Sequence, residues 1–218
     1  MTNLPPIPAD AIGRVTVSPK RKKRRSFRRH HPSAWLLLLL VAFSIGCSVL
    51  IETRSASNTS MNLSSSQLSA LIADKAAEVG ISDHLSELQA IVKVESNGQA
   101  DDVFQSSESA GLPPNTLGVH DSIDQGVRYY KSLLDKAATL GVDQDAVFQA
   151  YNYGSGYLDF VAANGGHHTQ ALAEEFSKTY ADGRIVSYPN PVAIDANGGW
   201  RYDYGNMFYV QLIHQHLG

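Results

Sequence analysis

The 218 residues carry a formal net charge of −3 and one cysteine, Cys47. A single cysteine excludes a disulfide within the chain, and its place in an apolar run leaves the remainder without a thiol for catalysis or metal binding. Nine of the 18 Lys and Arg residues but only one of the 21 Asp and Glu residues precede Ala34, so nine bases and twenty acids follow.

The apolar run from Ala34 to Ile51 comes directly after this basic section and contains no charged residue. At helical rise it is about 27 Å long, which predicts a single transmembrane helix over residues 34–51. Positive charge before the run places the basic tail, residues 1–33, in the cytoplasm and the C-terminal part outside the cell membrane. A basic run alone also suits nucleic acid, but its position favours a membrane partner and no nucleic acid.

The fate of this segment has three interpretations, of which a retained anchor is the first. A small-residue site at Ser55–Ser57 would allow cleavage and secretion. The residues before Cys47 partly match a lipoprotein box, although Ser44 stands where that pattern has an apolar residue. Residues 52–66 are rich in Ser, Asn and Thr, which predicts a flexible spacer before a domain at residues 67–218.

Two helices are predicted at the start of this domain. Apolar residues recur at helical spacing over 68–79, before the stop signal of Gly80. A second apolar stripe follows a predicted cap at Ser82 or Asp83 and ends at Glu95.

The helical period is lost over residues 97–120, which contain Gly111, Pro113 and Pro114. This predicts a long loop, with a short hairpin around 104–110 as an option. Long irregular segments inside a compact domain tend to be functional.

Helices account for most of the remaining chain. Ser122 and Gln125 have the spacing of a capping box, which predicts a helix that ends at Gly141, and Asp143 is expected to cap the next. The other segments are helices at 157–164, 170–180 and 204–217, with a Pro- and Gly-rich loop at 187–199. The fold class is therefore mainly α, with a long loop or small hairpin insert beside a cleft and a single transmembrane helix before it.

Several chemistries find no support in the sequence. No pair of histidines has the spacing of a zinc protease helix, and His167 and His168 lie beside glycines in an expected solvated turn. No Gly-rich phosphate loop follows a strand. We therefore expect no metal and no cofactor.

Carboxylic acid chemistry remains, and Glu95 is its first candidate. Cleavage of a glycosidic bond needs one acid to protonate the leaving oxygen and usually a second carboxylate. A helix C-terminus and an apolar wall both disfavour the charged form of Glu95 and are expected to raise its pKa. Asp101, Asp102 and Glu108 lie on the adjoining loop, near enough for it to bring one of them opposite Glu95. Such residues alone more often belong to a solvated surface than to an active site.

Three motifs, in this order along the chain, resemble those of a known family. They are Glu95-Ser96, the run DVFQSSES at residues 102–109, and AYNYG at residues 150–154. They resemble the lysozyme-like domain of soluble lytic transglycosylases and related muramidases, the goose-type lysozyme superfamily. The QSSES run at residues 105–109 and the sequence WRYDYGN at residues 200–206 resemble more closely still the muramidase domain of two-domain Gram-positive cell-wall hydrolases.

The resemblance implies a role for each matching residue. Glu95 matches the general acid and Asp102 the second acid of the muramidase branch. The implied substrate-binding residues are Ser96, Gln105, Ser106, Tyr151 and Asn152. The family's Gly-Leu-Met-Gln element reads Asp-Val-Phe-Gln here, which favours hydrolysis over formation of anhydro products.

Structural alternatives stand beside these roles. Asp102 could instead cap a loop turn. Tyr151 also fits a position in the core, and Asn152 also fits the end of a helix. Glu108 is interpreted as a loop-ordering acid. The C-terminal aromatic residues, interpreted as packing residues, are Tyr202, Tyr204, Phe208 and Tyr209.

The implied function is that of an N-acetylmuramidase, a membrane-anchored glycoside hydrolase. It would cut the β-1,4 bond between N-acetylmuramic acid and N-acetylglucosamine in peptidoglycan, for local remodelling or opening of the cell wall. The expected partners are glycan strands, the membrane and a secretion, conjugation or wall-synthesis machinery. The alternatives are a lytic transglycosylase that gives 1,6-anhydro products and a non-catalytic glycan-binding adaptor. An acid at the helix end together with a loop carboxylate favours an enzyme over an adaptor.

Overall fold

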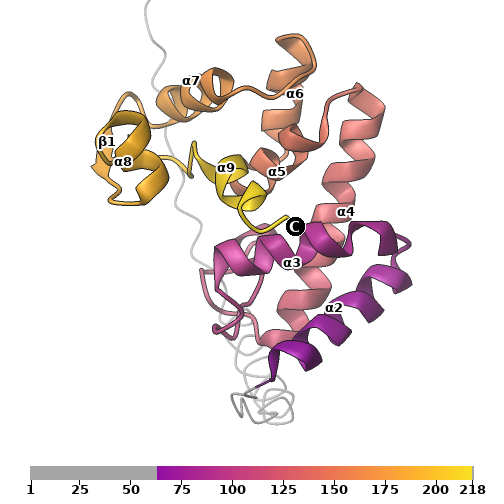
Figure 1. The fold of residues 1–218 in the computed structure, drawn as a ribbon. Helices are drawn as coiled ribbons and strands as arrows, with labels where there is room; N and C mark the ends of the chain where they lie inside the picture. Colours follow the sequence, from indigo (N-terminus) through magenta and orange to yellow (C-terminus); the bar gives the residue numbers. More distant parts are fainter. Residues whose placement is uncertain (1–62, 218) are drawn as a thin grey trace, which may run out of the picture. The chain divides into compact units, whose positions relative to one another are not determined.

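The computed structural model describes residues 63–217, which form a helical fold with one small antiparallel sheet at its edge (Figure 1). The expectations for the basic tail, the membrane span and Cys47 lie outside these residues. Within 63–217, no helix combines the length and apolar character needed to cross a bilayer.

The first two helices have different kinds of start. Helix α2 (Ser65–Glu78) begins at a capping box in which Ser64 and Gln67 exchange hydrogen bonds. Helix α3 (Leu85–Glu95) follows the 3-10 turn η1 (Ser82–His84). The predicted cap at Ser82 or Asp83 is wrong, because both residues lie inside this turn and α3 starts without a side-chain cap.

The loop after α3 contains no strand, so the optional hairpin at 104–110 is wrong. It contains only the 3-10 turn η2 (Glu108–Ala110). Backbone N–H groups of the loop donate to the carboxylate of Asp102 instead of to a partner strand.

Helix α4 (Val119–Leu140) begins earlier than predicted, and the capping box at Ser122 and Gln125 is wrong. Ser122 lies inside the helix and is fully buried. Its hydroxyl donates to Asp102 Oδ1 at 2.6 Å, so a tertiary contact uses the group that would otherwise cap.

Three predicted helices agree with the structure. Helix α5 (Gln144–Tyr153) starts where Asp143 Oδ1 accepts a hydrogen bond from the Ala146 N–H at 3.0 Å. Helices α6 (Gly156–Ala163) and α7 (Gln170–Tyr180) follow.

The C-terminal part departs most from prediction. Strands β1 (Ile185–Ser187) and β2 (Trp200–Tyr202) pair antiparallel, and helix α8 (Pro191–Asn197) lies between them where a loop was expected. Asn190 caps α8 and Pro191 occupies its first position, where proline is tolerated.

The predicted helix over 204–217 is reduced to α9 (Tyr209–His214). Gly205 has a φ of 51°, and a Cβ at this position would lie 2.5 Å from the ring of Tyr153. The chain therefore turns sharply against α5 before α9 can start.

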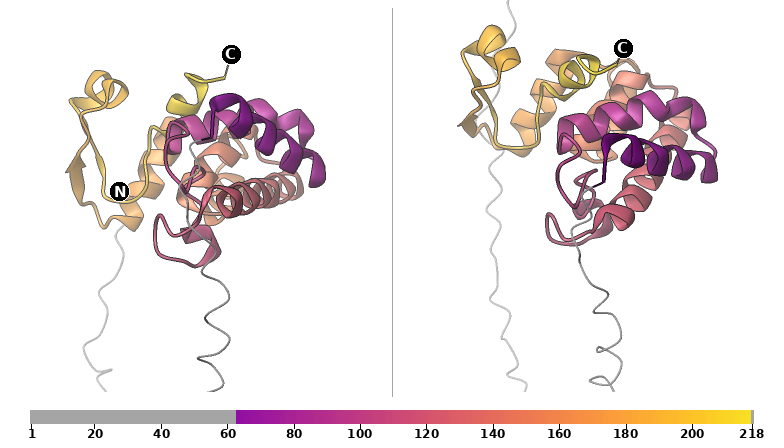
Figure 2. Two further views of the ribbon diagram at one scale, coloured as in Figure 1. Left: turned by 90° about the horizontal axis from the view of Figure 1, so that it is seen from below. Right: turned by 60° about the horizontal axis from the view of Figure 1, so that its bottom comes forward.

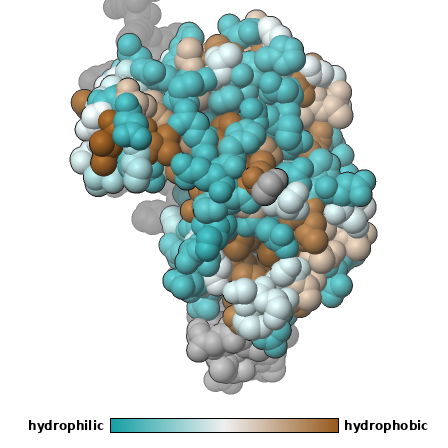
Figure 3. Space-filling model, viewed as in Figure 1, coloured by the Kyte–Doolittle hydropathy of each residue, from teal (hydrophilic) through white to brown (hydrophobic). Residues whose placement is uncertain are grey.

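The β1–α8–β2 segment lies apart from α2 and α3 in all views (Figures 1 and 2). Figure 3 shows hydrophobic residues gathered on its surface, where Ile185 and Ile194 are 60% and 51% exposed.

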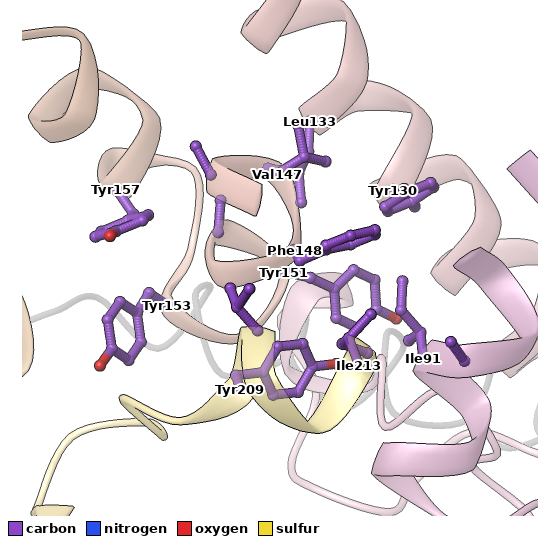
Figure 4. Close-up of a cluster of buried hydrophobic side chains, with 14 of the residues drawn as sticks. Ile91, Tyr130, Leu133, Val147, Phe148, Tyr151, Tyr153, Tyr157, Tyr209 and Ile213 are labelled. Atoms are coloured by element: carbon purple, nitrogen blue, oxygen red, sulfur yellow. The ribbon is translucent and has the colours of Figure 1, made fainter. Parts of the chain in front are cut away.

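Helix α5 occupies the centre of the fold, in contact with α4, α6 and α9. Figure 4 shows its Phe148 and Tyr151 packed with Ile91 of α3 and Ile213 of α9, all of them buried. This core fixes the ends of α3 and α5 beside each other.

Candidate active site

A cavity of about 490 Å³ lies where α3 ends beside α4 and α5. Its walls are the C-terminal residue of α3, the loop that follows, one residue of α4, and the end of α5. The lining residues are Glu95, Gln105, Ser106, Glu108, Ser109, Tyr129, Tyr151, Asn152, Tyr153 and Gly154.

Glu95 is the last residue of α3, which the buried side chains of Ile91 and Val92 anchor in the core. Its Oε1 accepts a hydrogen bond of 2.6 Å from the hydroxyl of Tyr209 in α9. Burial raises the pKa of Glu95 to about 7; the Tyr209 hydrogen bond opposes the rise, and the negative charge of Asp102 adds to it. The predicted upward shift is confirmed, with burial as its main cause.

Tyr209 was interpreted from the sequence as a packing residue only. Its ring is buried among hydrophobic side chains, but its hydroxyl reaches Glu95. Burial and the nearby charge of Glu95 hold the pKa of Tyr209 well above its ordinary value, so it is a stable donor. Nothing in the local sequence links two residues 114 positions apart.

Asp102 lies behind the cavity wall and is 1% exposed. Its Oδ1 accepts from the Ser106 N–H and the Ser122 hydroxyl, and its Oδ2 accepts from the N–H and hydroxyl of Ser107. Burial alone would raise the pKa of Asp102, but these hydrogen bonds together lower it. The carboxylate is saturated and is not among the residues that line the cavity.

The hydrogen bonds around Asp102 extend along the loop. Ser107 Oγ accepts from the N–H groups of Thr116 and Leu117, each at 3.0 Å, which ties the far end of the loop to its start. The Ser122 hydroxyl accepts from the Phe104 N–H. The loop therefore has one defined shape although it contains no strand.

Ser96 and Gln105 have different places in this arrangement. The Ser96 hydroxyl donates to the Val103 carbonyl at 2.7 Å and accepts from the Gly98 N–H, so it joins α3 to the loop and does not line the cavity. Gln105 does line it, with a left-handed φ of 47°. Its Nε2 donates to Asp102 O and to Asn115 Oδ1.

The other predicted binding residues reach the cavity. Ser106 lines it but is buried, and its hydroxyl donates to the Ser122 carbonyl. The Tyr151 hydroxyl donates to Phe104 O at 3.0 Å, and Asn152 Oδ1 accepts from the Asn206 N–H at 2.7 Å. Contacts within the protein therefore fix both α5 side chains.

The lining residues that were not predicted as site residues are Glu108, Ser109, Tyr129, Tyr153 and Gly154. Tyr129 comes from α4 and packs against Tyr151, with ring centroids 5.4 Å apart. Glu108 was interpreted as a loop-ordering acid, but it is exposed and lines the cavity. No cluster of three or more His, Cys, Asp or Glu side chains suited to a metal ion occurs within residues 63–217.

Comparison with known proteins relates this fold to cell-wall hydrolases. A family model described as lysozyme-like matches residues 65–217. The muramidase/DL-endopeptidase CwlT of Bacillus subtilis is 40% identical over 107 residues, which cover 49% of this chain and 32% of CwlT. YocA of the same species, named as an uncharacterized membrane protein, is 32% identical over 147 residues, covering 66% of this chain and 64% of YocA.

A solved structure is similar as well. It is the crystal structure of a Staphylococcus aureus Mu50 protein described as similar to a lipoprotein of the NLP/P60 family, with 53% identity and a TM-score of 0.68. The match covers 69% of this chain and 51% of that chain. The chain thus spans about a third of CwlT and about half of the staphylococcal protein.

Proposed function

The chain belongs to the lysozyme-like family, and from this membership we propose that it is an N-acetylmuramidase that hydrolyses peptidoglycan. The bond cut is the β-1,4 link between N-acetylmuramic acid and N-acetylglucosamine. The observation that carries the proposal is the position of Glu95 in the cavity with a pKa of about 7.

Glu95 has the property that a general acid needs. Near neutral pH a substantial fraction of its carboxyl groups hold a proton, which can pass to the glycosidic oxygen as the bond breaks. The Tyr209 hydrogen bond stabilises the carboxylate that remains and fixes its orientation.

The cavity walls have the chemistry of a sugar site. Aromatic faces pack against sugar C–H groups, and amides pair with hydroxyl and acetamido groups. Tyr129 and Tyr151 supply aromatic surface, and Gln105 and Asn152 supply amides. The muramidase named in CwlT, a relative at 40% identity, supports the muramidase assignment.

The other residues named by the resemblance receive supporting roles in this proposal. Asp102 and Ser96 hold the loop against α3 and α4, since neither lines the cavity. Ser106 forms part of the wall through its backbone and buried side chain.

Glu95→Gln tests the proposal. Purified peptidoglycan is incubated with the wild type, with this variant and with Glu175→Gln, the same change at an exposed position of α7. Mass spectrometry of released fragments should show reducing N-acetylmuramic acid ends for the wild type and the control, and none for Glu95→Gln, which still folds. Equal cleavage by all three proteins would refute the role of Glu95. Release of 1,6-anhydro ends would identify a lytic transglycosylase. If the wild type binds the wall without cleaving it, the protein is an adaptor.

We further propose that the span at residues 34–51 anchors the domain outside the cell membrane. The basic section before this apolar run supports this topology. The similarity to YocA, which is named as a membrane protein, supports association with a membrane. Alkaline extraction of cell membranes should leave the full chain in the membrane fraction, and external protease should digest its C-terminal domain. A shorter soluble product that starts near Ser55–Ser57 would show cleavage instead.

A further inference from the structure

We propose that Glu108 is the second carboxylate of the reaction and accepts the proton of the attacking water. This inference rests on the proposed glycan hydrolysis and assigns to Glu108 the part that the family resemblance gives to Asp102.

The first argument is access to the cavity. Of the Asp and Glu residues within 63–217, Glu95 and Glu108 line the cavity. Asp102 does not line it. Water that enters the cavity therefore meets Glu108, whereas Asp102 lies behind the wall at 1% exposure.

The second argument is the capacity to take a proton. The carboxylate oxygens of Asp102 already accept four hydrogen bonds, from Ser106, Ser107 and Ser122. Protonation of Asp102 would break contacts that hold the loop. Within residues 63–217, the side chain of Glu108 has no hydrogen bond or ion pair. Its oxygens are thus available to a water molecule.

The third argument is that Glu108 has a fixed backbone position. It opens η2, where its carbonyl accepts from the Gly111 N–H at 2.9 Å. The preceding Ser107 is bound to Asp102, and the following Ser109 accepts a hydrogen bond from Gln125 of α4. These contacts hold the backbone of Glu108 on both sides, which fixes the point from which its side chain enters the cavity wall.

The reaction balances with these two residues. Glu95 gives its proton to the glycosidic oxygen as the bond from that oxygen to C1 breaks. A water oxygen forms the new bond to C1, and the proton it loses passes to Glu108. Exchange with solvent then restores the proton on Glu95 and removes it from Glu108. A single displacement of this kind inverts the β-linkage, so the first reducing end formed is the α-anomer.

Glu108→Gln tests the assignment, with Asp101→Asn as the matched control. Asp101 is an exposed acid on the same loop and does not line the cavity. Loss of a general base lowers kcat by on the order of 100-fold or more. The kcat of Glu108→Gln should therefore fall by this factor, while Asp101→Asn retains the wild-type kcat. Sodium azide, which attacks without losing a proton, should restore turnover of Glu108→Gln and give the α-glycosyl azide.

The outcomes separate this inference from the proposed function. If Glu108→Gln is as active as Asp101→Asn while Glu95→Gln is inactive, the role of Glu108 is overturned and the muramidase proposal stands. A β-anomer as the first product of the wild type, seen by proton NMR, or 1,6-anhydro ends would also overturn the role of Glu108. A wild type that cleaves no glycan overturns both.

Discussion

The hydroxyl of Tyr209 donates a hydrogen bond of 2.6 Å to Oε1 of Glu95, which joins the C-terminal helix α9 to the end of α3. A hydrogen bond to a carboxylate favours its charged form. This contact therefore sets how far burial raises the pKa of Glu95.

Tyr209→Phe removes this hydrogen bond and keeps the ring in the core. Since the Tyr209 hydroxyl lowers the pKa of Glu95, its loss should raise that pKa above its value of about 7. The alkaline limb of kcat/KM should move to higher pH, as measured with soluble glycan fragments from pH 5 to 9. Tyr180→Phe changes an exposed tyrosine and should leave the limb in place. An unmoved limb in Tyr209→Phe would show that the hydrogen bond does not control the acid.

Glu95 should also destabilise the fold at alkaline pH. The pKa of Glu95 is about 7 in the folded state, against its ordinary value of 4.5, so the folded state binds more protons between these two pH values. Stability therefore falls as the pH rises from 4.5 to 7, by about 3 kcal/mol at most. Urea unfolding should show that the free energy of unfolding of Glu95→Gln, relative to that of the wild type, is higher at pH 8 than at pH 5. An identical difference at both pH values would contradict the raised pKa.

Asp102→Asn should loosen the loop. An amide has one acceptor oxygen where the carboxylate has two, so buried Ser107 or Ser122 donors lose a partner at about 1–3 kcal/mol each. We expect a lower melting temperature and faster protease cleavage within residues 103–118. Azide should not restore activity, because Asp102 holds the loop in place and does not accept the proton of the attacking water. Asp101→Asn is the control, and equal stability of the two variants would refute the positioning role.

Gly126→Ala should disturb the same loop from the side of α4. A Cβ at Gly126 would lie 2.4 Å from the ring of Phe104, which is fully buried. Overpacking of this kind costs about 1–3 kcal/mol, so unfolding by urea should show a loss of this size together with lower glycan cleavage. Gly118→Ala is the control, since a Cβ there would meet nothing within 4 Å. Equal stability of the two variants would show that Phe104 moves without cost.

Local signals predicted most of the helices. Asp143 caps α5 as its sequence position indicates, and α7 covers the residues 170–180 predicted for it. These features depend on residues within a turn or two of each other, so a single segment contains the information. The same locality explains the errors. Ser122 has the spacing of a capping residue, but a carboxylate 20 positions earlier takes its hydroxyl.

For the candidate site, the sequence determined which residue types were present and in what order. Glu95 at the end of an apolar helix indicated an acid with a raised pKa, and the family resemblance carried by the motifs at residues 102–109 and 150–154 implied that its substrate is a glycan. Only the tertiary structure decided which carboxylates face the cavity. It placed Asp102 behind the wall and Glu108 in it, and it brought Tyr209 to Glu95. The physical reason is that side-chain exposure and pKa depend on packing between elements distant in sequence, which local spacing does not encode.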